Sequence, residues 1–173
     1  VGALDKATSG KVWIDGQDIF SMPEKKLTVF RRQHIGFIFQ SFNLIPELNV
    51  EQNITFPLLL DYKRPDQRFV NELLNVLGLT ERRHHLPSQL SGGQRVAIGR
   101  ALVTRPALIL ADEPTGNLDS KNSQEVLALL QTMSAKYQQT ILMITHNKNH
   151  ASAADRIFNM SDGVLKELGV SRK

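Results

Sequence analysis

Short apolar segments recur along the chain and predict strands. "KVWIDG" (11–16) alternates apolar and polar residues and ends in a turn, a pattern typical of a strand. "IGFIFQ" (35–40) predicts a second short strand, and "ALILA" (107–111) and "TILMIT" (140–145) predict parallel strands buried on both faces. "RIFNM" (156–160) and "VLKEL" (164–168) flank an Asp-Gly turn and predict two more.

Helix signals separate these strands. Ser21 and Glu24 form a predicted capping box before "EKKLTVFRRQ", and Asn49 with Gln52 caps a second helix. "RVAIGRALV" predicts a helix that Pro106 closes. Two other helices carry apolar stripes at helical spacing, formed by Phe69, Leu73, Leu74 and Leu77 in one and by Val126, Leu130 and Met133 in the other.

Strands that alternate with helices favour an α/β fold with a parallel sheet. A stretch of helices and loops interrupts the alternation near residues 45–90. We therefore expect a single domain over 1–173, in which 1–44 and 91–173 form the α/β core and 45–90 a helical subdomain.

Composition is that of an ordinary globular protein. The chain has 173 residues, of which 41% are hydrophobic and 22% charged, enough for one domain with a real core. It has no cysteine, which excludes disulfides and thiolate metal sites. No apolar run approaches the roughly 20 residues that span a bilayer, and residues 1–10 do not resemble a signal peptide. A soluble, cytoplasmic protein is the expectation.

The net charge of +4 raises the question of a nucleic-acid partner. Basic residues cluster at 31–32 and 82–85, where they are typical of solvated helix ends. Aromatic residues make up only 6% of the chain, which leaves little for base stacking. We predict no nucleic-acid partner.

Polar residues follow three of the predicted parallel strands: Gln40, the pair Asp112-Glu113, and His146. Ligands of open α/β sheets bind at the carboxyl ends of the strands, so this convergence indicates a site. Neighbouring strand residues point to opposite faces, so one carboxylate can reach Mg²⁺ while the other faces an attacking water. For an isolated Asp-Glu pair, helix capping is the more common explanation.

"SGGQ" (91–94) places unhindered backbone N–H groups at the start of a helix, where an anion is favoured. The same residues also make an ordinary loop and cap. His146 can bond a phosphate oxygen or be a satisfied strand-end histidine. His146 and His150 have the spacing of zinc ligands, but no acidic partner completes the motif, and we do not predict zinc.

Together these motifs resemble those of the ATP-binding cassette (ABC) ATPases, the motor domains of ABC transporters. "LSGGQ" (90–94), 13 residues, "LILADEPTGNLDS" (108–120) and a later "ITH" (144–146) appear in the family's order, and the resemblance covers essentially the whole chain. "QSFNLIPELNVEQNI", "DEPTGNLDS" and "PSQLSGG" are most similar to the branch serving lipoprotein release, macrolide export and antimicrobial-peptide (bacitracin-type) resistance.

The resemblance implies a P-loop NTPase-like fold with a helical signature subdomain, and ATP and Mg²⁺ as cofactors. It assigns a role to each matched position: Q-loop glutamine and Mg²⁺ sensor (Gln40), Walker B metal ligand (Asp112), general base (Glu113), D-loop aspartate (Asp119), switch histidine (His146), and signature residues (Ser91, Gly92, Gly93 and Gln94). Two cassettes meet head to tail in this family, so the signature residues serve the partner's nucleotide. A membrane-spanning permease is the other implied partner, at the inner face of the cell membrane.

The pattern departs from the family at the P-loop. The family needs G-x-x-x-x-G-K-[ST], and the sequence contains none. The nearest match, Gly10-Lys11, has Asp5 for the first glycine and Val12 for Ser or Thr. We therefore expect a truncated cassette without the first strands. Loss of about three charge-assisted contacts would weaken ATP binding about a thousandfold or more. The missing strand would also leave an apolar sheet edge beside "LILAD".

A second departure is that Arg95 follows Gln94 at once, where the family usually has two more polar residues. Deleting two helical residues rotates the residues that follow by about 200° and shifts them by about 3 Å relative to the signature loop. Either the helix therefore starts later, or the signature loop is distorted.

The sequence thus predicts the catalytic part of an exporter's ATPase, with no ATP turnover by this chain alone. One alternative is a non-catalytic interaction module that complements an intact cassette through its signature face. Another is a DNA-maintenance ATPase, but the roughly 50 residues between Gln40 and Ser91 carry no sustained heptads.

Overall fold

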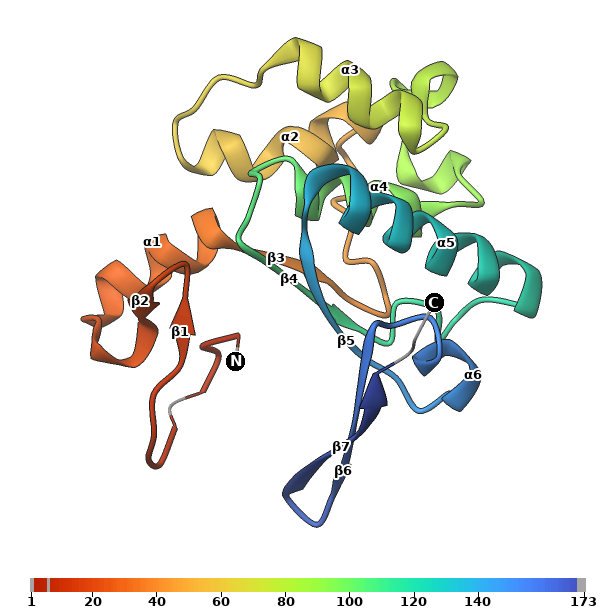
Figure 1. Cartoon of the computed structure of the whole chain (residues 1–173). Coiled ribbons are helices and arrows are strands. Elements are labelled where there is room, and N and C mark those ends of the chain that lie inside the picture. The colour runs from red at the N-terminus through yellow and green to blue at the C-terminus, as the bar shows by residue number, and fades with distance from the viewer. Residues whose placement is uncertain (1, 6, 171–173) are drawn as a thin grey trace.

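A three-stranded parallel sheet lies at the centre of the structure, a computed structural model that describes residues 2–5 and 7–170 (Figure 1). Its strands are β3 (Ile35–Ile38), β4 (Leu108–Asp112) and β5 (Thr140–Ile144), in the order β3-β4-β5. Gly36 pairs with Ile109, which pairs in turn with Ile141. All three strands therefore end at one edge of the sheet, as the sequence predicts.

One face of the sheet carries most of the helices (Figure 1). These are α2 (Val50–Leu60), α3 (Gln67–Val76), α4 (Gly93–Leu102) and α5 (Ser120–Tyr137). A single buried cluster joins them to the sheet, and its largest fully buried members are Ile38, Ile54, Leu73, Leu74, Leu77, Ile98, Leu102, Ile109 and Met133. The predicted stripes of the helices at 67–76 and 120–137 both lie in this cluster and are confirmed.

A close backbone approach sets the position of α4 on the sheet. A Cβ atom at Gly36 of β3 would lie 2.5 Å from the carbonyl oxygen of Ala101, so no larger residue fits without movement. The N-terminal part of the chain packs on α1 (Glu24–His34) through a second, smaller cluster formed by Ala3, Ile14, Ile19, Phe30 and Ile35.

The remaining elements are short and lie at the periphery. β1 (Trp13–Ile14) and β2 (Gln17–Asp18) form one antiparallel hairpin. β6 (Arg156–Ser161) and β7 (Val164–Val170) form another, which projects away from the helical layer (Figure 1). Single turns complete the chain: η1 (Ile19–Ser21), η2 (Thr80–Arg82), η3 (Pro87–Gln89) and α6 (Lys148–Ala151).

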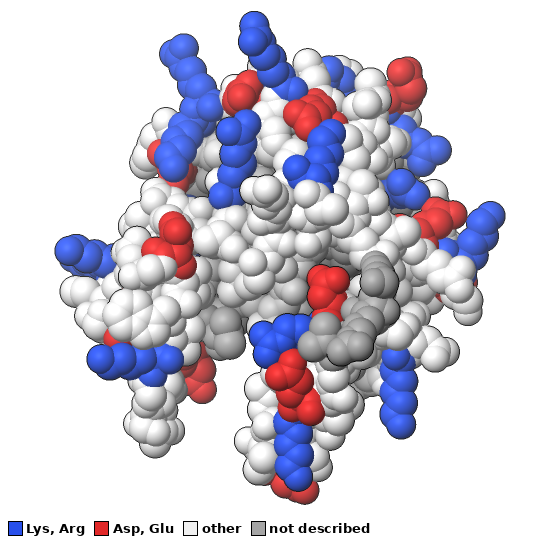
Figure 2. Space-filling view, in the orientation of Figure 1, with Lys and Arg blue, Asp and Glu red and all other residues white. Residues whose placement is uncertain are grey.

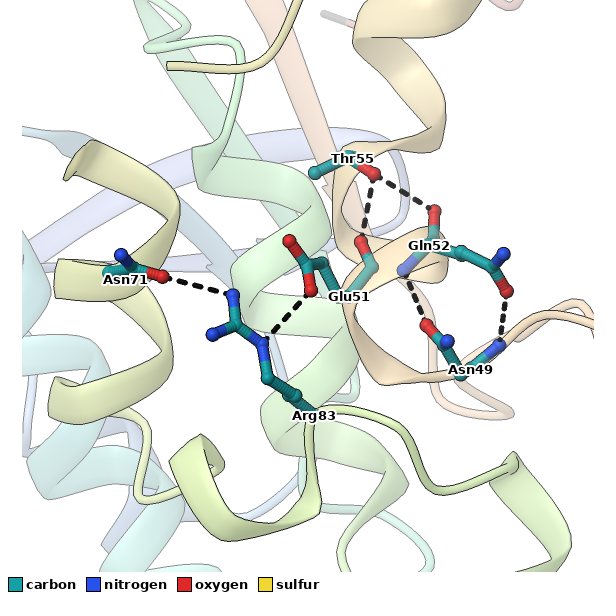
Figure 3. A network of polar contacts seen from close by, with 6 residues as sticks. All are labelled: Asn49, Glu51, Gln52, Thr55, Asn71 and Arg83. Atoms are coloured by element: carbon teal, nitrogen blue, oxygen red, sulfur yellow. Dashed lines mark hydrogen bonds and ion pairs between the residues drawn. The ribbon is translucent and has the colours of Figure 1, made fainter. Parts of the chain in front are cut away.

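The helices between β3 and α4 are joined by a polar network (Figure 3). Asn49 and Gln52 form the predicted capping box of α2, with each side chain accepting from the other's backbone N–H at 2.9 and 3.0 Å. Arg83 donates to Glu51 of α2 and to Asn71 of α3, both at 2.9 Å. One guanidinium therefore ties both helices to the segment that leads to the signature loop.

Three local predictions are wrong. Ser21 does not cap α1, because its hydroxyl donates to the carbonyl of Asp18 at 2.8 Å and Pro23 occupies the cap position. β5 is an edge strand and not a strand buried on both faces, since Ile144 is 58% exposed. β4 has a neighbour on each side, so the edge strands of the sheet are β3 and β5, and "LILAD" does not lie beside an open edge.

Figure 2 shows Lys and Arg side chains interspersed with acidic ones around the helical end of the molecule. Several of these charges are paired, for example Arg83 with Glu51 and Lys136 with Glu72. None of the helices in the described part of the chain is long and apolar enough to span a membrane.

Candidate functional site

The carboxyl end of the sheet brings Glu113 and His146 together. The backbone N–H of Glu113 donates to the carbonyl of Ile144 at 3.0 Å, extending the contact between the two strands by one residue. The Glu113 carboxylate then accepts from the backbone N–H of His146 at 2.6 Å and from the Thr145 hydroxyl at 3.2 Å. Its side chain is only 17% exposed. This carboxylate is therefore held in place by the chain that follows the neighbouring strand.

The backbone at Glu113 explains this orientation. The residue has a φ of 43°, in the left-handed region that non-glycine residues seldom adopt. β4 ends at Asp112, so the alternation of a strand does not decide where Glu113 points. The carboxylate accepts two hydrogen bonds and has the capacity to accept more, as a base acting on water requires.

The side chain of His146 stands in solvent, 96% exposed. Its Nε2 lies 3.8 Å from Oε1 of Glu113, close enough for an ion pair when the imidazole is protonated. In this position it can contact a group bound beyond the carboxyl ends of the strands, and it is not the satisfied strand-end histidine of the alternative explanation.

Asp112 is exposed, and its carboxylate has no hydrogen-bond or ion-pair partner within the described residues. Nor do the described residues contain a cluster of three or more acidic, histidine or cysteine side chains that could hold a metal ion by themselves. A lone carboxylate suits Mg²⁺, which usually takes one or two protein carboxylates and completes its shell with water and substrate phosphates. The residues present therefore fit Mg²⁺ that arrives with a phosphate ligand.

Gln40 faces the loop after β4. Its side-chain amide donates to Asn117 at 3.1 Å, and the amide of Asn117 donates back to the Gln40 carbonyl at 3.2 Å. A Cβ at Gly116 would lie 2.8 Å from Gln40 Nε2, so the glycine allows this close approach. Gln40 is thus brought to the same edge as Glu113, with its amide nitrogen directed at Asn117.

The contact between His150 and Thr115 was missed from the sequence, in which His150 stands out only by its spacing from His146. The buried Thr115 hydroxyl lies 3.0 Å from Nδ1 of His150, and the side-chain nitrogen of Asn147 lies 3.2 Å from Nε2 of the same ring. Both ring nitrogens are occupied, which removes His150 from the zinc alternative. The contact joins the loop after β4 to α6, and no spacing rule points to it.

The signature residues lie at the start of α4, as the sequence predicts. Gly92 is the N-cap, the helix begins at Gly93, and Ser91 is exposed. The helix therefore does not start later to absorb the short junction. Instead, Gln94 falls on the buried side of the helix, where it is 4% exposed. A surface contact between the Gln94 side chain and a nucleotide does not fit this placement.

A cavity of about 350 Å³ lies beside the signature loop, lined among others by Leu79, Arg82, Ser91, Gly92, Arg95 and Glu125. Arg95 donates to the Leu77 carbonyl at 3.2 Å and to Glu125 of α5 at 3.0 Å. These contacts fix the first turn of α4 between α3 and α5.

Asp119 is the N-cap of α5. Its carboxylate accepts from the backbone N–H of Asn122 and from the side-chain amide of the same residue, both at 2.8 Å. The backbone hydrogen bond from Asn122, together with the side-chain one, lowers the pKa of Asp119. Its placement in the structure is therefore that of a helix cap, beside the loop that carries Asn117.

Comparison with known proteins agrees with this arrangement. Residues 2–116 match the family described as "ABC transporter". The chain is 45% identical over 168 residues to the lipoprotein-releasing system ATP-binding protein LolD of Psychrobacter arcticus, covering 94% of this chain and 74% of that protein. It is 43% identical over 173 residues to the macrolide export ATP-binding/permease protein MacB of Rhodopirellula baltica, covering 96% of this chain and 25% of that protein.

Among solved structures, the ATP-binding cassette MJ0796, a dimer in a post-hydrolysis state bound to ADP and Pi, is similar with a TM-score of 0.80 and 38% identity. The match covers 97% of this chain and 77% of that one.

Proposed function

Because the chain belongs to the ABC transporter family, whose cassettes are ATPases, we propose that it is the ATP-hydrolysing part of an exporter of lipoproteins, peptides or macrolide-like compounds. The observation that carries this proposal is the Glu113 carboxylate, tied to Thr145 and the His146 N–H at the carboxyl end of the sheet. The exposed, partnerless Asp112 carboxylate beside it supports the same chemistry.

Glu113 is the general base in this proposal. It accepts a proton from a water molecule that attacks the γ-phosphate of ATP, which releases ADP and phosphate. His146 would donate to the γ-phosphate, Asp112 would hold Mg²⁺, and Gln40 would act as the Mg²⁺ sensor. Mg²⁺, when bound, neutralises the charge that develops on the phosphates.

The partners follow from the same family relation. A second cassette would present its nucleotide to the exposed Ser91 and to the backbone N–H groups of Gly92 and Gly93. A membrane-spanning permease would hold the chain at the inner face of the cell membrane. LolD and MacB are named for lipoprotein release and macrolide export, and antimicrobial-peptide export is the finer assignment that the sequence motifs favour. We also propose that residues 45–90 act as the helical subdomain.

One observation favours a second candidate function. Ser91 of the signature motif is exposed just before the N-cap of α4, where it is open to a nucleotide held by another cassette. In this second candidate the chain hydrolyses nothing itself and completes the nucleotide site of an intact cassette through Ser91.

A mixing experiment tests both functions. ATP turnover is measured for the chain alone, for intact LolD from P. arcticus alone, and for the two together. Three variants of the chain are compared: Glu113→Gln, Ser91→Arg and the control Ser88→Arg, an exposed serine three positions before Ser91. Isothermal calorimetry with Mg²⁺ and ATP on Glu113→Gln measures binding without turnover.

The variants separate the candidates. We expect no turnover by the chain alone, because its sequence contains no G-x-x-x-x-G-K-[ST] motif. Turnover that is lost in Glu113→Gln would overturn that expectation and support the first function for this chain. Stimulation of LolD that survives Glu113→Gln and Ser88→Arg but is lost in Ser91→Arg supports the second. If the chain neither hydrolyses ATP nor changes LolD turnover, both proposals fail for this chain.

A further inference from the structure

The segment that follows Gln40 is held in an unusual backbone conformation. Phe42 and Asn43 have φ values of 59° and 45°, both in the left-handed region. Two backbone bonds close this turn, from the Phe42 N–H to the Phe39 carbonyl at 3.0 Å and from the Asn43 N–H to the Ser41 carbonyl at 2.6 Å. Consecutive residues keep this left-handed backbone conformation only where surrounding contacts hold it in place.

Arg100 of α4 supplies such contacts. Its guanidinium donates from Nη1 to the Asn43 carbonyl and from Nη2 to the Phe42 carbonyl, each at 2.6 Å. The side chain is half-buried, and among the described residues no carboxylate forms an ion pair with it. Burial lowers the pKa of Arg100. A desolvated guanidinium without a counter-charge depends on these two carbonyls for its polar contacts.

The same face of α4 touches this segment a second time. A Cβ at Gly93 would lie 3.2 Å from the Phe42 ring and 3.4 Å from the Leu44 side chain. Gly93 and Arg100 are seven residues apart, about two helical turns, and therefore share a face. The segment 40–44 is thus clamped along α4, from the signature glycine to the guanidinium.

We propose that Arg100 is a positioning residue. By holding the carbonyls of Phe42 and Asn43 it keeps the side chain of Gln40 on Asn117, and it ties the segment 40–44 to α4, the helix that follows Ser91. A role of Gln40 in catalysis rests on the proposed function, whereas the position of the Gln40 side chain is a property of the folded chain. Lys cannot replace Arg100 fully, because one ammonium group does not present two donors in a planar fork.

The test uses the ¹⁵N-labelled chain without nucleotide. Hydrogen exchange is measured at the amides of Phe42 and Asn43, and the side-chain amide resonance of Gln40, assigned by its loss in Gln40→Glu, reports the contact with Asn117. We expect Arg100→Met to speed exchange at both amides at least tenfold and to move the Gln40 resonance toward that of a solvent-exposed amide. Arg100→Lys should give intermediate values.

Arg95→Met is the matched control, because Arg95 lies on the same helix and also donates to a backbone carbonyl, that of Leu77. It should leave Phe42, Asn43 and the Gln40 resonance unchanged. The proposal is overturned if Arg100→Met leaves exchange within twofold of wild type, or if Arg95→Met accelerates the same amides equally. Neither readout involves ATP, so a failed proposed function and a failed positioning role are distinguishable.

Discussion

The substitution Gly36→Ala tests how α4 is held on the sheet. The added Cβ would lie 2.5 Å from the carbonyl oxygen of Ala101 and 3.2 Å from the Ala101 Cβ. The first of these atoms belongs to the helix backbone and cannot rotate away. Either β3 or the last turn of α4 must therefore move, by at least about 0.5 Å, and overpacking of this kind typically costs about 1–3 kcal/mol.

The expected loss in unfolding free energy is therefore about 1–3 kcal/mol, which lowers Tm by roughly 2–12 °C for a chain of this size. Urea unfolding followed by circular dichroism measures it directly. Lys26→Ala is the control for stability, because Lys26 is exposed on α1 and alanine is a good helix former. A Gly36→Ala protein with wild-type Tm and urea midpoint would show that the backbones of β3 and α4 separate freely, and would refute the argument.

Further substitutions test the core and two helix caps. Leu73→Ala should lower the unfolding free energy by about 2–5 kcal/mol, because Leu73 is fully buried. Leu60→Ala, at an exposed position, should change the unfolding free energy by less than about 0.5 kcal/mol. Equal losses for the two variants in urea titrations would contradict this expectation. Asn49→Ala should cost about 1 kcal/mol by removing the α2 cap, and an unchanged urea midpoint would exclude that role. The pKa of Asp119 is lowered mainly by the Asn122 N–H, so the stability that it contributes is present above the unfolded carboxyl pKa and is lost as the pH falls through the lower, folded value. Asp119→Asn, which caps without titrating, should flatten this part of the acid dependence of the urea midpoint, and an unaltered acid profile would show that the carboxylate is not responsible.

Periodicity and capping rules predicted most of the elements, because the information they use is local. The stripe from Phe69 to Leu77 and the Asn49–Gln52 box lie where the sequence predicts them. The convergence of Gln40, Asp112 and His146 at one sheet edge also followed, since parallel strands end together.

Other features depend on neighbours that no local pattern identifies. β5 has the composition of a buried strand, but only β4 pairs with it, so Ile144 remains exposed. Ser21 has the right spacing for a cap, yet its hydroxyl finds Asp18 instead.

The candidate site shows the same division. The sequence identifies Glu113, but its orientation comes from a positive φ and from the His146 N–H, which are backbone features. The sequence also names Gln94 as a binding residue, but the helix start at Gly93 turns it inward. The sequence does not distinguish Arg100 from other arginines, because a single arginine in a helix has no distinctive spacing.

The packing of α4 implies that contacts along this helix, remote from the signature loop, determine where the loop lies. At three glycines where α4 meets its neighbours, an added Cβ would lie 3.2 Å or less from another atom. These are Gly36 of β3 against α4, Gly93 against Phe42, and Gly99 against side chains of the helical cluster. Arg100 adds two hydrogen bonds to the segment after Gln40. Ser91 is exposed and directly precedes the N-cap of α4, so its place relative to Glu113 depends on where that helix lies. A displacement of the segment 40–44 must therefore either break the Arg100 contacts or carry α4, and Ser91 with it.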